Sequence, residues 1–420
     1  MNGGEVMNEN IWFDDIEQFL VCPRRYCIEK TSRNYERIPD EQKTRELMKL
    51  KFSIEKPVIS ADLFGNTLIS SPDAIVPHGE MWKILMKKTA KRFKKKYLLE
   101  AAFHGYVFSS NGYIISQVIV ESPYFRASID WKEGIPHLFS VIENIVYSQM
   151  DDPPVPKPVS QCKTCRHVLE CTKILVKEGS LLAIHGLNSK LKMKLIEQGV
   201  TDLPDILSKD IDYISIDTVE KLRKKVTALL EDKVLVISQY DRLEEGVFLD
   251  IESHPLKDFD YLFGVLVDDK YIPYLCESIE DEYRVFGELL DFLDRTSGPI
   301  YHYCPYEPSR FSSLVNRWSD LGTVYRKIKT RFVDVYQILV KHIALPLFTY
   351  SLKSVARFLG YQWRTNLDGL RASRYYQLWL STRDQEYLDI LLEYNEDDTR
   401  ATKLVVEKLN YFRNQKVIYR

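Results

Sequence analysis

The clearest pattern of apolar and polar positions lies in the last third of the chain. In residues 247–252 an apolar run carries Asp250 and Glu252 at alternate positions, and the two-residue period of a strand places both carboxylates on one face. Similar patterns predict strands at 261–267, 271–276 and 300–303 and helices at 279–295 and 387–410. Three strands followed by alternating helices and strands indicate an α/β fold with a mixed sheet and flanking helices.

Earlier parts of the chain add helical patterns and a spacer. Residues 11–20 have the period of an amphipathic helix, and the proline-rich stretch 151–159 indicates a connection between domains. Residues 218–232 form a charged amphipathic pattern that leads into a predicted strand at 233–238. We therefore expect three domains, at residues 1–177, 178–240 and 241–420.

Composition is that of an ordinary globular protein. The 420 residues exceed what one hydrophobic core spans, and 45% of them are apolar and 28% charged. A net charge of -2 gives no general affinity for nucleic acids, so such binding requires local basic patches. No run of 18 apolar residues occurs, and the start of the chain lacks the order of a signal peptide. We expect a cytoplasmic protein without membrane contact, whose cysteines are thiols or metal ligands.

Three separate acidic positions point to metal chemistry. Adjacent carboxylates such as Asp250 and Glu252 repel each other when buried, so either solvent wets the strand end or a cation lies between them. Asp398 lies four residues after Tyr394, on the same face of a predicted helix. Glu307 follows a predicted strand and supplies a further acid at its end. A divalent metal site and a solvated strand end are the two interpretations.

The order and spacing of these acids carry a family resemblance. The positions that resemble the three motifs of the tyrosine-type DEDD 3′→5′ exonucleases are Asp250-x-Glu252, Glu307 and Tyr394-x-x-x-Asp398. Residues 246–412 most resemble the RNase H-like domains of that superfamily that are fused to RecB-like modules. Residues 332–336 and 351–360 resemble that family's strand and its "SLK…LG" helix. The family usually has Asp in the second motif, so Glu307 departs from the pattern.

The resemblance implies a mechanism and its residues. It implies two Mg²⁺ or Mn²⁺ ions and hydrolysis of phosphodiester bonds in DNA or RNA. The implied metal ligands are Asp250, Glu252, Glu307 and Asp398. In the resembled family a tyrosine orients the attacking water, and Tyr394 matches that position. A phenol pKa of about 10 favours hydrogen bonding over proton abstraction; packing of the helix against the sheet is the alternative role.

Four of the seven cysteines form a second pattern. They are Cys22, Cys162, Cys165 and Cys171. One early cysteine and a later CxxC with a further Cys resemble the iron–sulfur closure of RecB-type nucleases, in which four thiolates hold a [4Fe–4S] cluster. Tetrahedral sulfur coordination also suits zinc, with Cys27 or His167 as substitute ligands. Unrelated buried cysteines are the remaining interpretation.

The resembled RecB-like nuclease centre is incomplete in this chain. Asp73 supplies the first carboxylate, but Leu85 stands where the metal-binding Glu belongs, and an apolar side chain cannot coordinate a divalent ion. Glu100 and His104 occupy the positions of the family's Gln and Tyr. We expect a degenerate RecB-like fold without activity of its own. The alternative is that the RecB-like part remains an active endonuclease, which cleaves with Asp73 and an acid at another position in the sequence.

Two stretches are candidates for contact with nucleic acid. Residues 83–96 contain eight cations and no acid, and a phosphate backbone relieves such repulsion, although a solvated face is the ordinary explanation. The candidates there are Lys87, Lys88, Lys91, Arg92, Lys94 and Lys95. Residues 184–203 resemble a helix-hairpin-helix module, in which the backbone at Gly186 contacts a phosphate and Lys190 adds charge. A structural spacer explains that segment equally well.

The sequence thus favours a metal-dependent 3′→5′ exonuclease that acts on DNA or RNA, with the RecB-like part as a binding platform. A non-catalytic nucleic-acid-binding scaffold with two decayed centres is the competing interpretation, because Glu307 and Leu85 both depart from the resembled motifs. The two interpretations differ in whether the four acids bind a divalent ion.

Overall fold

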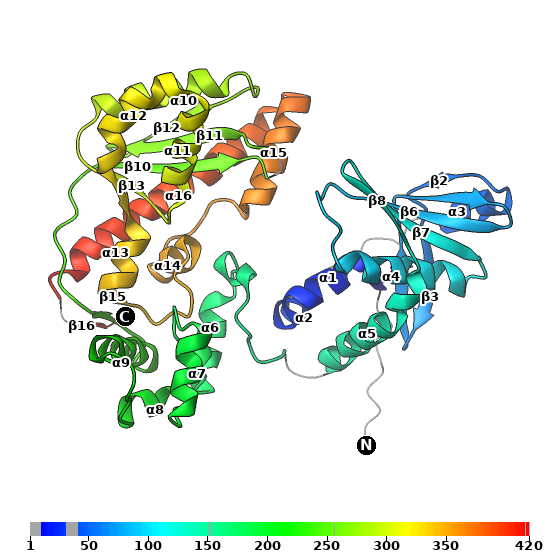
Figure 1. The fold of residues 1–420 in the computed structure, drawn as a ribbon, viewed down its shortest axis with the longest axis horizontal. Helices are drawn as coiled ribbons and strands as arrows, with labels where there is room; N and C mark the ends of the chain where they lie inside the picture. Colours follow the sequence, from blue (N-terminus) through cyan, green and yellow to red (C-terminus); the bar gives the residue numbers. More distant parts are fainter. Residues whose placement is uncertain (1–9, 31–40, 151–152, 256, 416, 420) are drawn as a thin grey trace. The chain divides into compact units, whose positions relative to one another are not determined.

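The computed structural model describes residues 10–30, 41–150, 153–255, 257–415 and 417–419. The chain forms two compact units, residues 1–159 and 160–420, and Figure 1 shows the elements of each. Each unit has helices around a sheet with both parallel and antiparallel pairs, which confirms the α/β prediction. Within the described ranges, no helix combines the length and apolar character needed to cross a membrane.

The first unit contains two sheets. The larger has the order β2-β5-β6-β7-β8, with β6 and β7 parallel and the other neighbours antiparallel. The smaller has the order β1-β4-β3. The strands are β1 (Asn10–Trp12), β2 (Ile54–Glu55), β3 (Ile59–Leu63), β4 (Asn66–Ser70), β5 (Ala74–His78), β6 (Met81–Lys87), β7 (Ile115–Ser122) and β8 (Phe125–Ile129).

Helix α4 lies at the centre of the core of this unit. Its residues 101–103 are fully buried, and a Cβ at Gly105 would come within 2.3 Å of the Trp131 ring, so glycine permits this close packing. The amphipathic helix predicted at 11–20 is present from Phe13 onward as α1, whereas Ile11 and Trp12 belong to strand β1, which pairs with β4. The helices are α1 (Phe13–Val21), α2 (Pro23–Lys30), α3 (Glu41–Lys49), α4 (Lys96–Ser110) and α5 (Ile135–Met150).

The second unit contains a five-stranded sheet with the order β12-β11-β10-β13-β14. Its first three strands form an antiparallel meander, and β13 pairs in parallel with both β10 and β14. The strands are β10 (Val247–Ser253), β11 (Asp260–Val267), β12 (Lys270–Leu275), β13 (Ile300–His302) and β14 (Phe332–Asp334). The strands predicted from the alternating patterns of this region are therefore confirmed.

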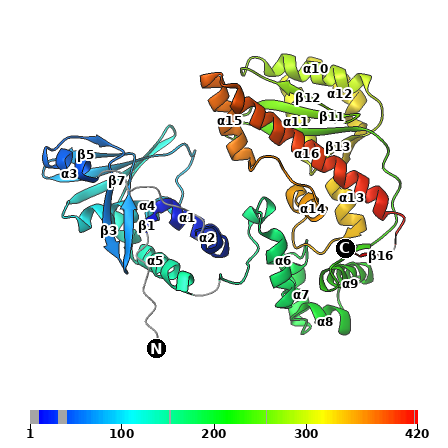
Figure 2. The ribbon, with the colours of Figure 1, turned by 180° about the vertical axis from the view of Figure 1, so that it is seen from behind.

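Helices cover both faces of this sheet. In Figures 1 and 2, α16 crosses one face and α10, α11 and α12 lie over the other. Leu249 and Ile251 of β10 belong to the core that includes Leu289 of α10, whereas Phe248 packs with Val405 of α16. The helices are α10 (Glu282–Arg295), α11 (Tyr306–Arg317), α12 (Gly322–Ile328), α13 (Val335–His342), α14 (Leu352–Phe358), α15 (Gly369–Thr382) and α16 (Gln385–Phe412). Alternate side chains of β10 thus point to opposite faces of the sheet, as the two-residue period of a strand predicts.

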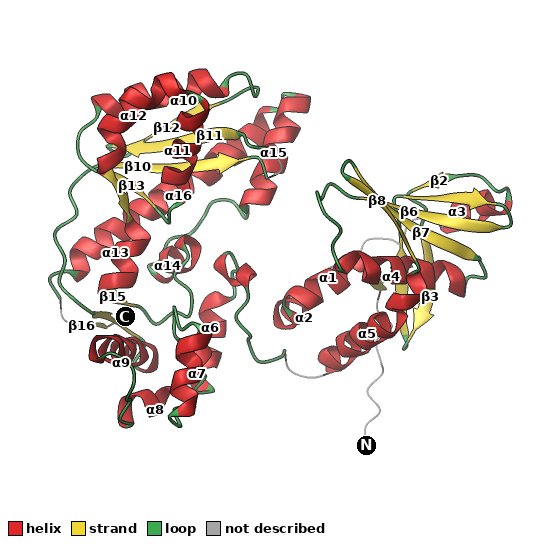
Figure 3. Ribbon diagram, in the orientation of Figure 1, coloured by secondary structure: helices red, strands yellow, loops and turns green. Residues whose placement is uncertain are grey.

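The second unit begins with a helical region that has its own small core (Figure 3). Leu195, Leu203 and Val226 are buried in that core. The helices are α6 (Val168–Lys177), α7 (Ser189–Glu197), α8 (Leu203–Ser208) and α9 (Ile216–Leu230). The following strand β9 (Lys233–Val236) pairs with β15 (Ile343–Ala344) and β16 (Val417–Tyr419). The helix and strand predicted at 218–238 correspond to α9 and β9.

Candidate metal centre

Carboxylates from two elements converge beside the sheet of the second unit. Asp250 and Glu252 come from β10 and Asp398 from α16, and one oxygen of each lies within 4.8 Å of the others. Gly264 of β11 pairs with Asp250, and a Cβ at Gly264 would come within 1.6 Å of Asn395 Oδ1. Glycine therefore lets α16 approach the sheet closely enough for its acid to meet those of the strand.

Hydrogen bonds orient two of these carboxylates. Asn395 Nδ2 donates to Asp250 Oδ2 at 2.7 Å, and Tyr271 Oη in turn donates to Asn395 Oδ1 at 2.7 Å. Trp363 Nε1 donates to Asp398 Oδ1 at 2.8 Å. Such donors fix the direction of a carboxylate in the same way as the outer partners of known metal ligands.

The carboxylates carry more negative charge than their neighbours balance. Burial raises the pKa of Asp250 and of Glu252 well above the usual range, and the nearby acids raise both further. Burial also raises the pKa of Asp398, and the charge of Lys353 opposes that rise. Lys353 Nζ donates to Leu367 O at 2.6 Å and balances only part of the negative charge. This set of oxygen donors fits a hard divalent cation.

Glu307 lies at the start of α11, outside the group of three oxygens. It is 4% exposed, and its Oε2 has no hydrogen-bond partner among the described residues, although His302 Nδ1 lies at 3.5 Å. Burial raises the pKa of Glu307, and its charge helps to raise the pKa of Asp250 and Glu252. An unpaired buried oxygen is unfavourable unless a ligand takes it up. Glu307 therefore fits an additional ligand for a metal ion.

A strained turn precedes α11. Cys304 has a φ of 72°, a left-handed conformation that is unfavourable for residues other than glycine. Its N–H donates to Asp334 Oδ1 at 3.0 Å, and its carbonyl accepts a hydrogen bond from His302 Nδ1 at 2.6 Å. These contacts hold the turn and so set the position of Glu307.

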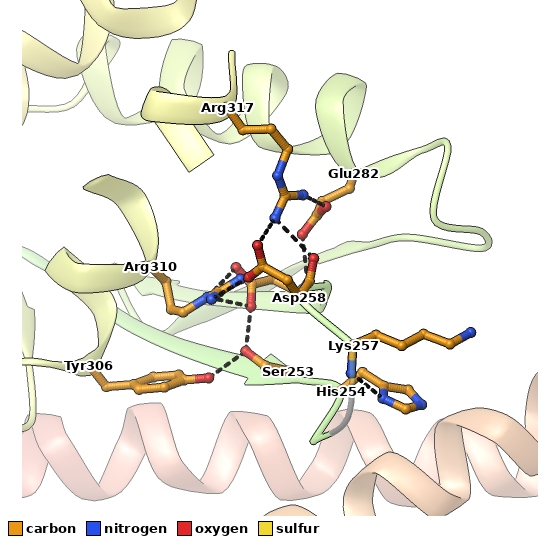
Figure 4. A network of polar contacts seen from close by, with 9 residues as sticks. Ser253, His254, Lys257, Asp258, Glu282, Tyr306, Arg310 and Arg317 are labelled. Atoms are coloured by element: carbon orange, nitrogen blue, oxygen red, sulfur yellow. Dashed lines mark hydrogen bonds and ion pairs between the residues drawn. The ribbon is translucent and has the colours of Figure 1, made fainter. Parts of the chain in front are cut away.

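A second network joins the end of β10 to α11 (Figure 4). Tyr306 Oη donates to Ser253 Oγ at 2.6 Å, and Ser253 Oγ donates to the buried carboxylate of Asp260. Arg310 Nε lies 2.8 Å from both oxygens of Asp260. Ser253 and Tyr306 each adjoin a site acid in the sequence, so the network fixes the strand end relative to the helix start.

Tyr394 lies one turn before Asp398 on α16. It is 5% exposed and has Lys353 Nζ at 4.6 Å from its ring centroid. Burial, followed by the charge of Asp398, raises the pKa of Tyr394 well above the usual range. Tyr394 therefore keeps its proton and is able to donate a hydrogen bond.

Several residues of this site were not predicted from the sequence: Gly264, Lys353, Trp363 and Asn395. Lys353 stands within the landmark 351–360, and Asn395 directly follows Tyr394, so proximity to the motifs was a usable signal for both. Trp363 and Gly264 act through contacts between distant parts of the chain, and a single sequence carries no signal for such contacts.

In the first unit, Asp73 lies just before β5, and Leu85 lies on the neighbouring strand β6. Asp73 Oδ2 accepts a hydrogen bond from the backbone N–H of Lys87 at 2.6 Å. Leu85 of β6 pairs with Ala74 and contributes no ligand atom. The described residues of this unit contain no group of three ligand atoms comparable to that of the second unit.

Glu100 and His104 of α4 have protein partners instead. Lys88 Nζ donates to Glu100 Oε1 at 2.6 Å, and His104 Nδ1 shares a hydrogen bond of 2.7 Å with Ser70 Oγ. Together with Asp14, Glu100 and His104 line a cavity of about 380 Å³. The polar groups of this cavity are thus largely satisfied within the protein.

The basic run of the first unit continues from β6 into the loop before α4. The exposed candidates are Lys87, Lys91, Arg92, Lys94 and Lys95. Lys88 is partly buried and forms the ion pair with Glu100. Contact of the exposed cations with nucleic acid stays a prediction, whereas Lys88 is engaged within the protein.

The predicted helix-hairpin-helix segment contains a glycine turn before a helix. Gly186 has a φ of 78°, and Asn188 caps α7 by accepting a hydrogen bond from the Leu191 N–H at 2.8 Å. Lys190 is exposed in the first turn of α7. This geometry is compatible with phosphate binding and with a spacer, so the nucleic-acid role of Gly186 and Lys190 stays a prediction.

The four cysteines of the predicted cluster are divided between the units. Cys22 ends α1 in the first unit. Cys162 and Cys165 lie in and after the 3-10 turn Ser160–Lys163 of the second unit, and Cys171 lies in α6. An iron–sulfur or zinc cluster at these positions stays a prediction.

Comparison with known proteins identifies the domain that carries the acidic centre. Residues 247–410 match the model of the RNase_H superfamily, which supports an RNase H-like domain in this part of the chain. Such domains generally hydrolyse phosphodiester bonds and typically use divalent metals, which indicates a nuclease-type activity and a nucleic-acid substrate. A solved structure described as "Crystal structure of SSO0001" shares 14% identity over 38% of this chain and 84% of its own, with a TM-score of 0.23. No curated protein matches the chain.

Proposed function

We propose that the second unit is a 3′→5′ exonuclease that hydrolyses phosphodiester bonds of DNA or RNA with two metal ions. The observation that supports this most strongly is the convergence of Asp250, Glu252 and Asp398 within 4.8 Å. These oxygens would suit Mg²⁺ or Mn²⁺, and the unpartnered Oε2 of Glu307 would suit a second ion. Bound ions supply activation of water and stabilisation of the departing 3′ oxygen.

The protein's own residues orient the reactants. Tyr394 is proposed to donate a hydrogen bond to the attacking water, because it keeps its proton and lies beside Asp398. Asn395 and Trp363 hold the carboxylates of Asp250 and Asp398 in fixed directions. Lys353 reduces the repulsion between the acids and an incoming phosphate. A tyrosine one turn before the last acid is the feature that favours an exonuclease.

The test is hydrolysis of single strands labelled at the 3′ or the 5′ end. With Mg²⁺, we expect release of labelled mononucleotide from the 3′-labelled strand and a ladder from the 5′-labelled strand. EDTA and Asp250→Ala are expected to abolish both. Internal cuts would contradict exonuclease action, and an Asp250→Ala protein that cleaves as well as the wild type would contradict the site.

We propose a supporting role for residues 1–177. In this proposal they form a degenerate RecB-like module whose exposed cations bind nucleic acid, and residues 178–240 form a helix-hairpin-helix-like connection. Four cysteines, Cys22, Cys162, Cys165 and Cys171, would hold a [4Fe–4S] cluster, with zinc as the alternative. Anaerobic purification distinguishes the two metals, because iron–sulfur protein is brown and zinc protein is colourless.

A further inference from the structure

The three clustered acids differ in their hydrogen-bond donors. Asp250 accepts from Asn395 and Asp398 accepts from Trp363. Glu252 is 7% exposed and accepts no hydrogen bond from any residue that the structure describes. Ligating carboxylates in metal sites are normally hydrogen-bonded through the oxygen that does not bind the ion. Among the described residues, Glu252 is therefore the clustered acid that has no hydrogen-bond donor.

Tyr261 of β11 has a hydroxyl group that lacks a hydrogen-bond acceptor among the described residues. Its side chain is fully buried, and its Oη has no hydrogen-bond partner in the described part of the chain. A buried hydroxyl without a partner destabilises a fold. Burial raises the pKa of Tyr261, and Glu252 and Asp250 raise it further. The hydroxyl thus lies within the electrostatic field of the acids and retains its proton as a donor.

A break in strand pairing places Tyr261 in this position. Glu252 pairs with Leu262 and Ser253 pairs with Asp260, so Tyr261 is an extra residue opposite the Glu252–Ser253 step. Bulges of this kind turn side chains away from the regular alternation and often occur beside active sites. The irregularity falls at the strand position that carries the site acid.

The neighbouring Tyr376 shows what a structural tyrosine does in the same surroundings. The rings of Tyr261 and Tyr376 are stacked with centroids 4.3 Å apart and planes at 14°. Tyr376 Oη donates to Cys276 O at 2.8 Å. Two stacked, buried tyrosines therefore differ in one respect: the hydroxyl of Tyr376 is satisfied by the backbone, and that of Tyr261 is not.

We propose that Tyr261 is a positioning residue that donates a hydrogen bond to Glu252 when a divalent ion is bound. Binding of the ion fixes one carboxylate oxygen of Glu252, and the hydroxyl of Tyr261 then fixes the other. Metal binding thus gives the buried hydroxyl of Tyr261 an acceptor and removes the unfavourable effect of leaving it unpaired. This inference rests on the proposed metal site and adds a residue that holds it.

The test compares Tyr261→Phe with the matched control Tyr376→Phe in the full-length chain. For Tyr261→Phe we expect the melting temperature in EDTA to rise by about 2–4 °C, because an unpaired hydroxyl is removed. We expect the dissociation constant for Mn²⁺ to increase about tenfold and kcat to fall about tenfold at unchanged KM. For Tyr376→Phe we expect a melting temperature lower by a similar amount and unchanged Mn²⁺ affinity.

Each result has a separate meaning. Unchanged Mn²⁺ affinity in Tyr261→Phe would overturn this proposal while leaving the proposed function intact. A lower melting temperature of Tyr261→Phe in EDTA would also overturn it, since the hydroxyl would then be paired without metal. Absence of Mn²⁺ binding by the wild-type protein would overturn the proposed function together with this inference.

Discussion

The two units treat buried acids in opposite ways. In the first unit, Glu100 is 9% exposed and Lys88 Nζ lies 2.6 Å away, so one cation neutralises one acid within the protein. In the second unit, Asp250, Glu252 and Asp398 face one another within 4.8 Å. A paired acid needs no ligand, whereas a group of acids gains stability from a divalent cation. This difference favours the second unit as the place of the proposed metal chemistry.

The histidine of the first unit supports the same contrast. His104 of α4 is 4% exposed and shares its Nδ1 hydrogen bond with Ser70. Burial lowers the pKa of His104 to about 3, so the ring stays neutral at physiological pH. The neutral ring is hydrogen-bonded to a buried serine, and the described residues of the first unit contain no cluster of three metal-ligand atoms.

The largest expected difference between the units is in the rate of hydrolysis after one acid is removed from each. Asp398→Asn removes a clustered acid and is expected to lower the rate of hydrolysis at least about a thousandfold. The matched variant Glu100→Gln is expected to leave the rate unchanged, because Glu100 is paired within the protein. Initial rates of mononucleotide release at saturating Mg²⁺ measure both. A loss in Glu100→Gln with activity in Asp398→Asn would reverse the comparison.

The next largest expected effect is a rise in the melting temperature of the second unit when a metal ion binds. A ligand present at 100 times its dissociation constant stabilises the folded state by about 2.7 kcal/mol. For a unit of this size that corresponds to a rise in melting temperature of about 5–10 °C. We expect scanning calorimetry to show this rise with Mn²⁺ for the transition of the second unit. The double variant Asp250→Asn/Glu252→Gln should abolish it.

The ion pair of the first unit offers a smaller perturbation. Lys88→Met leaves Glu100 buried without its cation, and we expect the first unit to lose about 2 kcal/mol of unfolding free energy. The further change Glu100→Leu should recover most of that loss, because it removes the unpaired charge. Urea unfolding with a probe in each unit measures the effect. A fall in hydrolysis rate in the folded Lys88→Met protein would link the pair to catalysis.

The elements of the second unit could be predicted because their signals are local. The two-residue alternation of β10 placed Asp250 and Glu252 on one face, and the four-residue spacing of α16 related Tyr394 to Asp398. What could not be predicted depends on contacts between distant segments. The approach of α16 at Gly264 and the burial of Glu307 follow from packing between elements, for which a single sequence provides no pattern.

The partners within the first unit escaped prediction for the same reason. Lys88 belongs to a run of cations that resembled one exposed surface, yet the turn after β6 brings it against Glu100 of α4. The remaining exposed cations of the run keep the predicted solvent contact. Charge density along a sequence therefore predicted a basic surface but not which of its members is used inside the protein.

Without metal, the stability of the second unit is expected to change gradually with pH. The acids Asp250, Glu252, Glu307 and Asp398 have pKa values raised by burial, so the folded state binds more protons than the unfolded state above pH of about 4. Stability then falls as pH rises, by up to about 1.4 kcal/mol per pH unit for each extra proton. Carboxylates with lowered pKa values give the opposite slope.

The measurement is the melting temperature of the second unit in EDTA between pH 5 and 8. We expect a decrease with pH in the wild type, a flatter profile in Asp250→Asn because one clustered charge is gone, and loss of the decrease when Mg²⁺ neutralises the acids. In the first unit, the ion pair of Glu100 with Lys88 should make the profile insensitive to Mg²⁺. A wild-type profile in EDTA that rises with pH would show that cations of the protein already balance the cluster, and the contrast between the two units would then disappear.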